Sequence, residues 1–193
     1  MTPHGDRGAE MARSLARAVR GQGVPDAGVA RVEEAHRLAM EPRVRSLGDD
    51  HHPAYLHPGR SALILLRDAS VTAVPVLAAA CLVETRDPEL RVAPERIGEG
   101  VGPDVEELVA AAPPPGAEGL AEALVIAPEE VRLVALAEHL DHLRHLHVRG
   151  PEPDWRERLD EVEAVWLPVA ERTHARLATR YRHWARIFRR RLG

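Results

Sequence analysis

The sequence predicts an all-α protein, folded as a single domain of roughly eight helices, and three observations support this fold class. Apolar residues recur at a helical spacing, as at Met11, Leu15 and Val19, which would lie on one face of a helix. Prolines and glycines separate such segments at points where one helix would end and the next begin. No segment needs to be a strand, and 193 residues suffice for one substantial core.

The first half of the chain contains four expected helices. Gly21 and Gly23 end the first of them, and Pro25 can begin the second. Residues 41–57 are polar and are expected to form a loop, after which Pro58 suits the first turn of the third helix. The fourth is apolar on nearly all sides, which is typical of a central buried helix. These helices are expected to cover residues 11–19, 26–40, 58–66 and 71–84.

The second half of the chain contains four more. Prolines begin two short helices and then, at Pro128, a long one that is interrupted at residues 150–153. Residues 111–119 include three successive prolines and are the clearest flexible stretch. Pro168 is expected to kink or divide the last helix. These helices are expected to cover residues 94–98, 103–112, 128–148 and 155–181.

Residues 1–25 are expected to form an N-terminal helix and linker, and residues 26–193 are expected to form the helical domain with a long C-terminal helix.

Composition and charge limit what the chain can do. A net charge of -4 argues against general nucleic-acid binding. No apolar run reaches the ~20 residues that span a membrane, and the N-terminus does not resemble a secretory signal. The single cysteine, Cys81, excludes an internal disulfide and suits a cytoplasmic location.

Four short segments carry a resemblance to a known family: Ala35-His36-Arg37, Pro53-Ala54-Tyr55-Leu56-His57-Pro58, Leu82-Val83-Glu84-Thr85-Arg86-Asp87 and Leu136-Ala137-Glu138-His139-Leu140-Asp141-His142-Leu143. They occur in the order found in the HD-domain hydrolases of the RelA/SpoT type. That group includes small stand-alone bacterial enzymes of the stringent response, which remove the 3'-pyrophosphate of guanosine tetraphosphate (ppGpp). The resemblance implies an HD-domain helical fold, a manganese site and a phosphorylated guanine nucleotide as ligand.

The resemblance also implies a set of metal ligands. The family holds manganese on a first His, an adjacent His-Asp pair and a distant Asp. His36 corresponds to the first His, Val83-Glu84 to the pair and Glu138 to the distant acid. The implied metal ligands are therefore His36, Glu84 and Glu138. Valine cannot bind a metal, and each glutamate is one methylene longer than the aspartate that it replaces.

Catalytic and substrate-binding residues follow from the same resemblance. Asp87 stands where the family has an acid that activates water, and Pro88 replaces a second acid. His142 stands in for an asparagine near the substrate, so it is assigned to catalysis and to substrate binding. Arg43 and Arg45 lie where the family binds its substrate, and both could pair with phosphate groups.

Each of these residues also has an ordinary structural interpretation. Asp87 could be a loop residue, and Arg43 and Arg45 could be solvated surface arginines. His142 belongs to a histidine-rich helix that could be partly solvated without binding anything. His57, next to Pro58 at the start of a helix, is interpreted as structural rather than catalytic.

Three functional hypotheses follow. The leading one is a degenerate HD-domain protein with lost or strongly reduced hydrolysis and a nucleotide-binding or regulatory role. The alternative is an active metal-dependent phosphohydrolase that acts on ppGpp or a related nucleotide through a rebuilt His/Glu site. The third is a protein that binds a partner through its arginine-rich C-terminal segment. Tyr181, Trp184 and Phe188 form one helical stripe in this segment, which favours instead a core-packed helix with a solvated arginine face. The arginines of this segment are Arg180, Arg182, Arg186, Arg189, Arg190 and Arg191.

Overall fold

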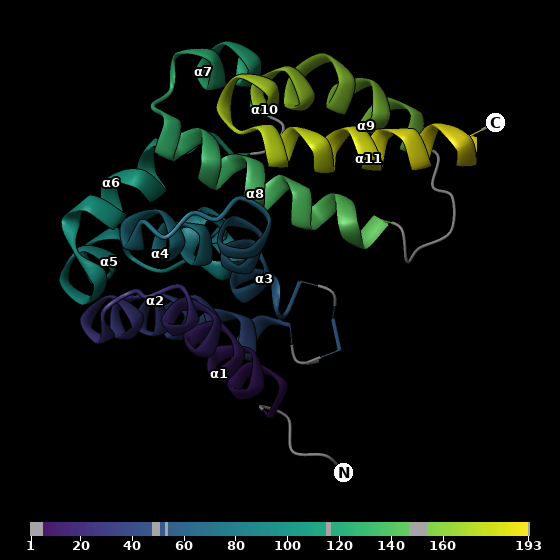
Figure 1. The fold of residues 1–193 in the computed structure, drawn as a ribbon. Helices are drawn as coiled ribbons and strands as arrows, with labels where there is room; N and C mark the ends of the chain where they lie inside the picture. Colours follow the sequence, from purple (N-terminus) through teal and green to yellow (C-terminus); the bar gives the residue numbers. More distant parts are fainter. Residues whose placement is uncertain (1–5, 48–50, 53, 115–116, 147–153, 193) are drawn as a thin grey trace.

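The computed structural model describes residues 6–47, 51–52, 54–114, 117–146 and 154–192, and all regular structure in these ranges is helical (Figure 1). The predicted all-α class is confirmed. Short π- or 3-10-helical segments join the α-helices at η1 (Ile64–Asp68), η2 (Val83–Arg86), η3 (Pro88–Leu90) and η4 (Val162–Trp166). The α-helices are α1 (Asp6–Gly21), α2 (Asp26–Ser46), α3 (His57–Leu63), α4 (Val74–Leu82), α5 (Pro94–Val101), α6 (Pro103–Ala111), α7 (Leu120–Ile126), α8 (Glu129–Leu146), α9 (Trp155–Glu161), α10 (Leu167–Thr173) and α11 (Ala175–Leu192).

The first half of the chain departs from the predicted elements in two places. Helix α2 continues through Pro42 to Ser46, where a polar loop was expected. The extension contains Arg43, whose buried guanidinium donates a hydrogen bond to the Ala39 carbonyl one turn earlier. The predicted apolar helix begins only at Val74, and its last residues form the 3-10 turn η2.

In the second half of the chain, the points at which helices begin and end differ from the prediction. Helix α7 was not predicted, and the predicted break at residues 150–153 lies outside the described residues. The last long helix is divided at His174, whose backbone is extended, and not at Pro168. The helix continues through Pro168, and the π-helical segment η4 lies just before this proline, so the helix is irregular there without being divided.

The core is centred on α4. This helix contacts α2 on one side and α8 on the other, and it also contacts α3 and α6. Its residues from Val76 onward are buried, as expected for a helix that is apolar all round. Helix α1 packs on α2 and α3, and its Leu15 and Val19 belong to the same core. The N-terminal helix therefore shares the core of the rest of the chain.

Helices α9, α10 and α11 lie beyond α8 as a hairpin in which α11 runs back along α9 (Figure 1). The predicted aromatic stripe of α11 is buried, and Tyr181 and Trp184 each donate a hydrogen bond to a carbonyl of α8. Several arginines of α11 form ion pairs with acidic residues of the chain, as Arg182 does with Glu171. None of the helices in the described ranges is long and apolar enough to span a bilayer. The hairpin thus anchors α8, which carries part of the site described next.

Candidate metal centre

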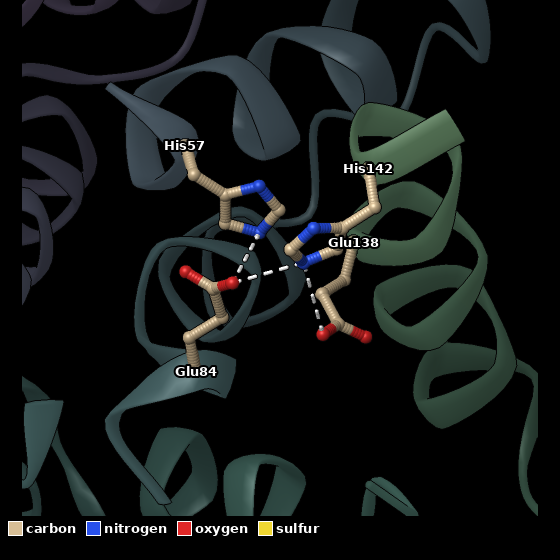
Figure 2. A group of neighbouring side chains, drawn as sticks. All are labelled: His57, Glu84, Glu138 and His142. Atoms are coloured by element: carbon tan, nitrogen blue, oxygen red, sulfur yellow. Dashed lines mark ion pairs between the residues drawn. The ribbon is translucent and has the colours of Figure 1, made fainter. Parts of the chain in front are cut away.

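Four side chains converge in a cleft between α3, η2 and α8 (Figure 2). His57 and His142 each offer an imidazole nitrogen, and Glu84 and Glu138 each offer a carboxylate oxygen. These four atoms all lie within 4.8 Å of one another. Nitrogen and carboxylate oxygen atoms at such separations are the usual ligands of several divalent metals. The group could therefore hold a metal ion.

His57 is the first residue of α3. Pro58 occupies the first turn, where a proline is favoured, and the start of the helix directs the His57 ring inward. Its Nδ1 lies 2.8 Å from Oδ2 of Asp141, and its Nε2 lies 3.6 Å from Oε1 of Glu84. Ser61, one turn later on α3, places its Oγ 3.1 Å from the same Nε2.

Glu84 reaches the cleft because α4 tightens into the 3-10 turn η2 at its end. Thr85 stabilises this turn by donating from Oγ1 to the Leu82 carbonyl at 2.6 Å. Arg43, on α2, donates a hydrogen bond to Oε2 of Glu84. The other carboxylate oxygen, Oε1, lies 2.9 Å from Nε2 of His142. One oxygen of Glu84 is thus paired with an arginine, while the other faces the two histidines.

Glu138 and His142 come from one face of α8, because residues four apart on a helix are neighbours. Oε1 of Glu138 lies 3.7 Å from Nε2 of His142. The residue Glu138 is only 3% exposed, and its Oε2 is buried without a hydrogen-bond partner among the described residues. The His142 side chain is 45% exposed and is the outermost member of the group.

Charged neighbours shift the pKa values of His142 and Glu84. Desolvation lowers the pKa of His142, but the neighbouring carboxylates of Glu138 and Glu84 outweigh it and raise that pKa to about 10. Burial raises the pKa of Glu84, but His57, His142 and Arg43 outweigh burial and lower it to about 2. Without a metal ion, His142 is therefore an imidazolium that bridges two carboxylates near neutral pH.

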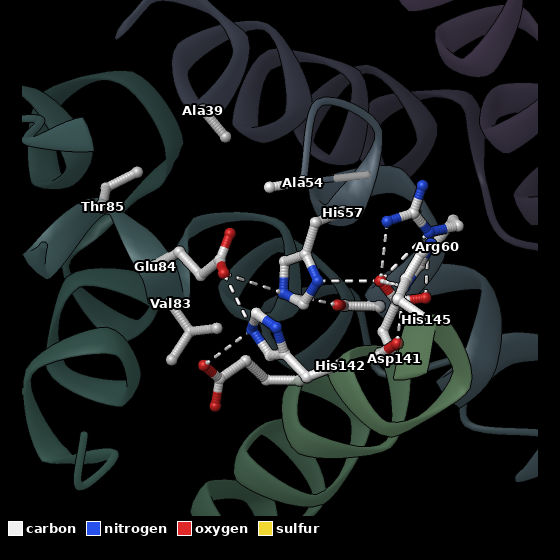
Figure 3. A network of polar contacts seen from close by, with 12 residues as sticks. Ala39, Ala54, His57, Arg60, Val83, Glu84, Thr85, Asp141, His142 and His145 are labelled. Carbon is white, nitrogen blue, oxygen red and sulfur yellow. Dashed lines mark hydrogen bonds and ion pairs between the residues drawn. The ribbon is translucent and has the colours of Figure 1, made fainter. Parts of the chain in front are cut away.

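Asp141 is the centre of a polar network behind His57 (Figure 3). Its carboxylate accepts hydrogen bonds from Nε of Arg60 at 3.0 Å and faces Nδ1 of His57. His145, one turn later on α8, lies 3.6 Å from the same carboxylate. Burial raises the pKa of Asp141, but the hydrogen bonds from His57 and Arg60 outweigh burial and hold that pKa well below its usual range. Asp141 is therefore an anion that contacts several basic groups.

The four side chains line a cavity of about 820 Å³, a size typical of sites for small molecules. Its walls carry charges of both signs: the carboxylates of Glu84, Asp87, Glu138 and Glu161 lie beside three arginines, whose guanidinium groups can pair with an anionic group of a ligand. Asp87 also lines the cavity, and its Oδ1 accepts a hydrogen bond from the backbone N–H of Glu89. The basic residues of the lining are His52, Arg60, Arg86, Arg158 and His145, in addition to His57, His139 and His142.

The residues predicted from sequence are brought together only in part. Glu84, Glu138 and His142 meet, whereas His36 does not join them. His36 is buried in α2, its Nε2 has no hydrogen-bond partner among the described residues, and burial together with the charge of Arg43 lowers its pKa to about 4. The histidine that meets the two glutamates is instead His57.

The two predicted phosphate-binding arginines also lie elsewhere than expected. Arg43 is 0% exposed and donates to Glu84 and to backbone carbonyls, so it belongs to the interior of the site. Arg45 is exposed on α2 and does not line the cavity. Arg60, Arg86 and Arg158 line it instead, and nothing in their local sequence distinguished them from other surface arginines.

His57 and Asp141 were not predicted as functional residues, although both lie in segments that carry the family resemblance. His57 was interpreted as structural because it begins a helix beside Pro58. Asp141 was quoted without a role. Their meeting depends on α3 packing against α8, which no local pattern reveals.

Two further observations of this structure indicate that the donor set fits a divalent metal ion. The buried Oε2 of Glu138 has no partner among the described residues, and such an atom is expected to face a cation or a polar ligand. His57 has a carboxylate behind its Nδ1, which is the usual arrangement of a metal-binding histidine. Val83, which the resemblance places at a His position of HD-domain hydrolases, is buried beside the group and contributes no donor atom.

No family model matches the chain, and no curated protein is significantly similar to it.

Proposed function

We propose that the chain is a metal-dependent phosphohydrolase whose ion is held by His57, Glu84, Glu138 and His142. The observation that carries the proposal is the buried Glu138 carboxylate, whose Oε2 is without a hydrogen-bond partner in the described part of the chain. A buried carboxylate that lacks compensation costs several kcal/mol. His142 approaches only Oε1, so a cation within the group would supply the missing interaction.

Two imidazole nitrogens and two carboxylate oxygens suit Mn²⁺, which the resemblance to HD-domain hydrolases implies, and they suit Zn²⁺ as well. Such an ion, when bound, lowers the pKa of a water molecule and polarises a phosphoryl oxygen. Arg43 supports this arrangement because it pairs with Oε2 of Glu84 and leaves Oε1 directed at the histidines.

Residues of the chain would bind and orient the substrate. Asp87 is exposed on the cavity wall, and its carboxylate can accept a proton from water in the cleft. Arg60, Arg86 and Arg158 also line the cavity, and guanidinium groups pair well with phosphate oxygens. The proposed substrate is a phosphorylated nucleotide, with ppGpp as the compound that the family resemblance suggests.

A second candidate is a nucleotide-binding or regulatory protein that does not hydrolyse its ligand. It is favoured by the two cations already in the group, since Arg43 compensates Glu84 and protonated His142 lies between Glu84 and Glu138. The absence of a donor at Val83 points the same way. In this case the two side-chain cations would take the place of the ion, and the arginines of the cavity wall would still bind a phosphorylated nucleotide.

Metal analysis and hydrolysis assays distinguish the two candidates. Protein purified without chelator would be assayed for bound metal and for thermal stabilisation by Mn²⁺, Zn²⁺ and Mg²⁺. It would then be incubated with ppGpp and with other phosphorylated nucleotides, and phosphate or pyrophosphate release would be measured. Glu138→Gln is the test variant, and Glu130→Gln is the matched control because it makes the same change on an exposed turn of the same helix.

A phosphohydrolase predicts metal-dependent turnover that Glu138→Gln abolishes and Glu130→Gln leaves intact. Nucleotide binding with neither metal binding nor turnover would favour the second candidate. A protein that neither binds metal nor contacts any of these nucleotides would exclude both.

A further inference from the structure

Asp141 contacts the candidate metal centre from behind His57. Its side chain is 2% exposed and lies 2.8 Å from Nδ1 of His57, whose side chain is also 2% exposed (Figure 3). Asp141 and His142 are adjacent on α8, so they project in different directions from the helix. Asp141 faces Nδ1 of His57, and His142 faces Glu84 and Glu138.

The contact determines which nitrogen of His57 carries a proton. A carboxylate can only accept a hydrogen bond, so Nδ1 must be the donor. In the neutral ring the lone pair then lies on Nε2, which is the atom directed at Glu84. A metal ion needs this lone pair, and a carboxylate behind a metal-binding histidine both orients the ring and makes its nitrogen more basic.

We infer that Asp141 is a positioning residue that holds the proton of His57 on Nδ1 and presents the Nε2 lone pair to the proposed metal ion. The inference rests on the proposed function, since it assigns Asp141 a role in that same site. Nothing in the resemblance to HD-domain hydrolases assigns a role to this residue.

Asp141 also positions a group that faces the ligand. Nε of Arg60 lies 3.0 Å from each oxygen of the Asp141 carboxylate, and its Nη2 lies 2.9 Å from Oδ2. Because Arg60 lines the cavity, the same carboxylate orients one metal ligand and one cation for an anionic substrate. Loss of Asp141 should therefore weaken the binding of metal and the binding of anions together.

The first measurement uses the metal-free protein. Nitrogen-15 NMR of labelled protein reports the tautomer of His57, whose signals are assigned with His57→Gln. We expect the proton on Nδ1 in the wild type. In Asp141→Asn the amide can donate to Nδ1, so the proton should move to Nε2.

The second measurement is calorimetric titration with Mn²⁺ and Zn²⁺. Asp141→Asn should weaken metal binding by roughly 10–100-fold, as expected for loss of a residue that orients a ligand. The matched control is Asp68→Asn, which removes a carboxylate that also pairs with two arginines, Arg144 and Arg180, but does not line the cavity. Arg60→Gln should keep the metal affinity and lose affinity for inorganic pyrophosphate.

The outcomes separate this inference from the proposed function. A wild-type His57 that carries its proton on Nε2 overturns the inference without reference to any variant or metal. The inference is also overturned if circular dichroism shows that Asp141→Asn is folded and the variant binds metal as tightly as the wild type. If the wild type binds neither metal while His57 keeps its proton on Nδ1, the proposed function fails, but the assignment of the Nδ1 proton to the contact with Asp141 stands.

Discussion

The guanidinium of Arg43 forms an ion pair with the carboxylate of Glu84 inside the protein, with none of the Arg43 side chain exposed and 13% of the Glu84 side chain exposed. Arg43→Met should lower the free energy of unfolding by roughly 3–5 kcal/mol, because it leaves a buried carboxylate without one of the cations that compensate its charge. Urea denaturation followed by circular dichroism measures this change.

The matched control for Arg43→Met is a substitution of Arg45, which lies two residues further along α2. Arg45 is exposed, and Arg45→Met should change the free energy of unfolding by less than about 0.5 kcal/mol. Equal effects of the two substitutions would show that the ion pair with Glu84 does not stabilise the fold.

His142 should make the metal-free protein less stable at high pH. Despite desolvation, Glu138 and Glu84 raise the pKa of His142 from 6.5 to about 10 in the folded protein. A raised pKa stabilises the fold fully below pH 6.5, and this stabilisation is lost as the pH rises through about 10. Melting temperatures of the wild type and of His142→Gln should therefore converge between these two pH values. A gap that stays constant over this range would contradict the imidazolium assignment.

Ser61 should compete with a metal ion for His57. Its Oγ lies 3.1 Å from Nε2 of His57 and can donate to the lone pair that the ion needs. Ser61→Ala removes a hydrogen bond worth about 0.5–1.5 kcal/mol, so metal affinity should rise by a few-fold in calorimetric titration. Ser46→Ala is the control, because Ser46 donates to the Glu89 carbonyl outside the cleft. Weaker metal binding in Ser61→Ala would mean that the hydroxyl supports the site.

Val83 provides a test of the family resemblance. Val83→His would place an imidazole where HD-domain hydrolases have one, beside Glu84 and in the cavity wall. The larger side chain should cost about 1–3 kcal/mol of stability, but metal binding should become tighter. Val76→His, at a buried position on α4 away from the cavity, should lose stability without any gain in affinity. Unchanged metal affinity in Val83→His would argue against the correspondence of Val83-Glu84 with the His-Asp pair.

The sequence by itself determined the helical class and the features that depend on neighbours in the chain. Glu138 and His142 share a face of α8 because they are one helical turn apart, and the aromatic stripe of α11 is buried for the same reason. These relationships follow from the period of the helix alone. Proline positions likewise marked several helix starts, since a proline is favoured in the first turn.

Only the tertiary structure decided which histidine meets the two acids. The sequence around His36 and the sequence around His57 do not indicate which distant residues these two histidines contact. The packing of α3 against α8 and α4 brings His57 to Glu84 and Asp141, while α2 keeps His36 in the core. The same packing buries Arg43, which looked like a surface arginine. Contacts between segments far apart in the chain depend on how whole helices pack, and the period of a single helix does not contain that information.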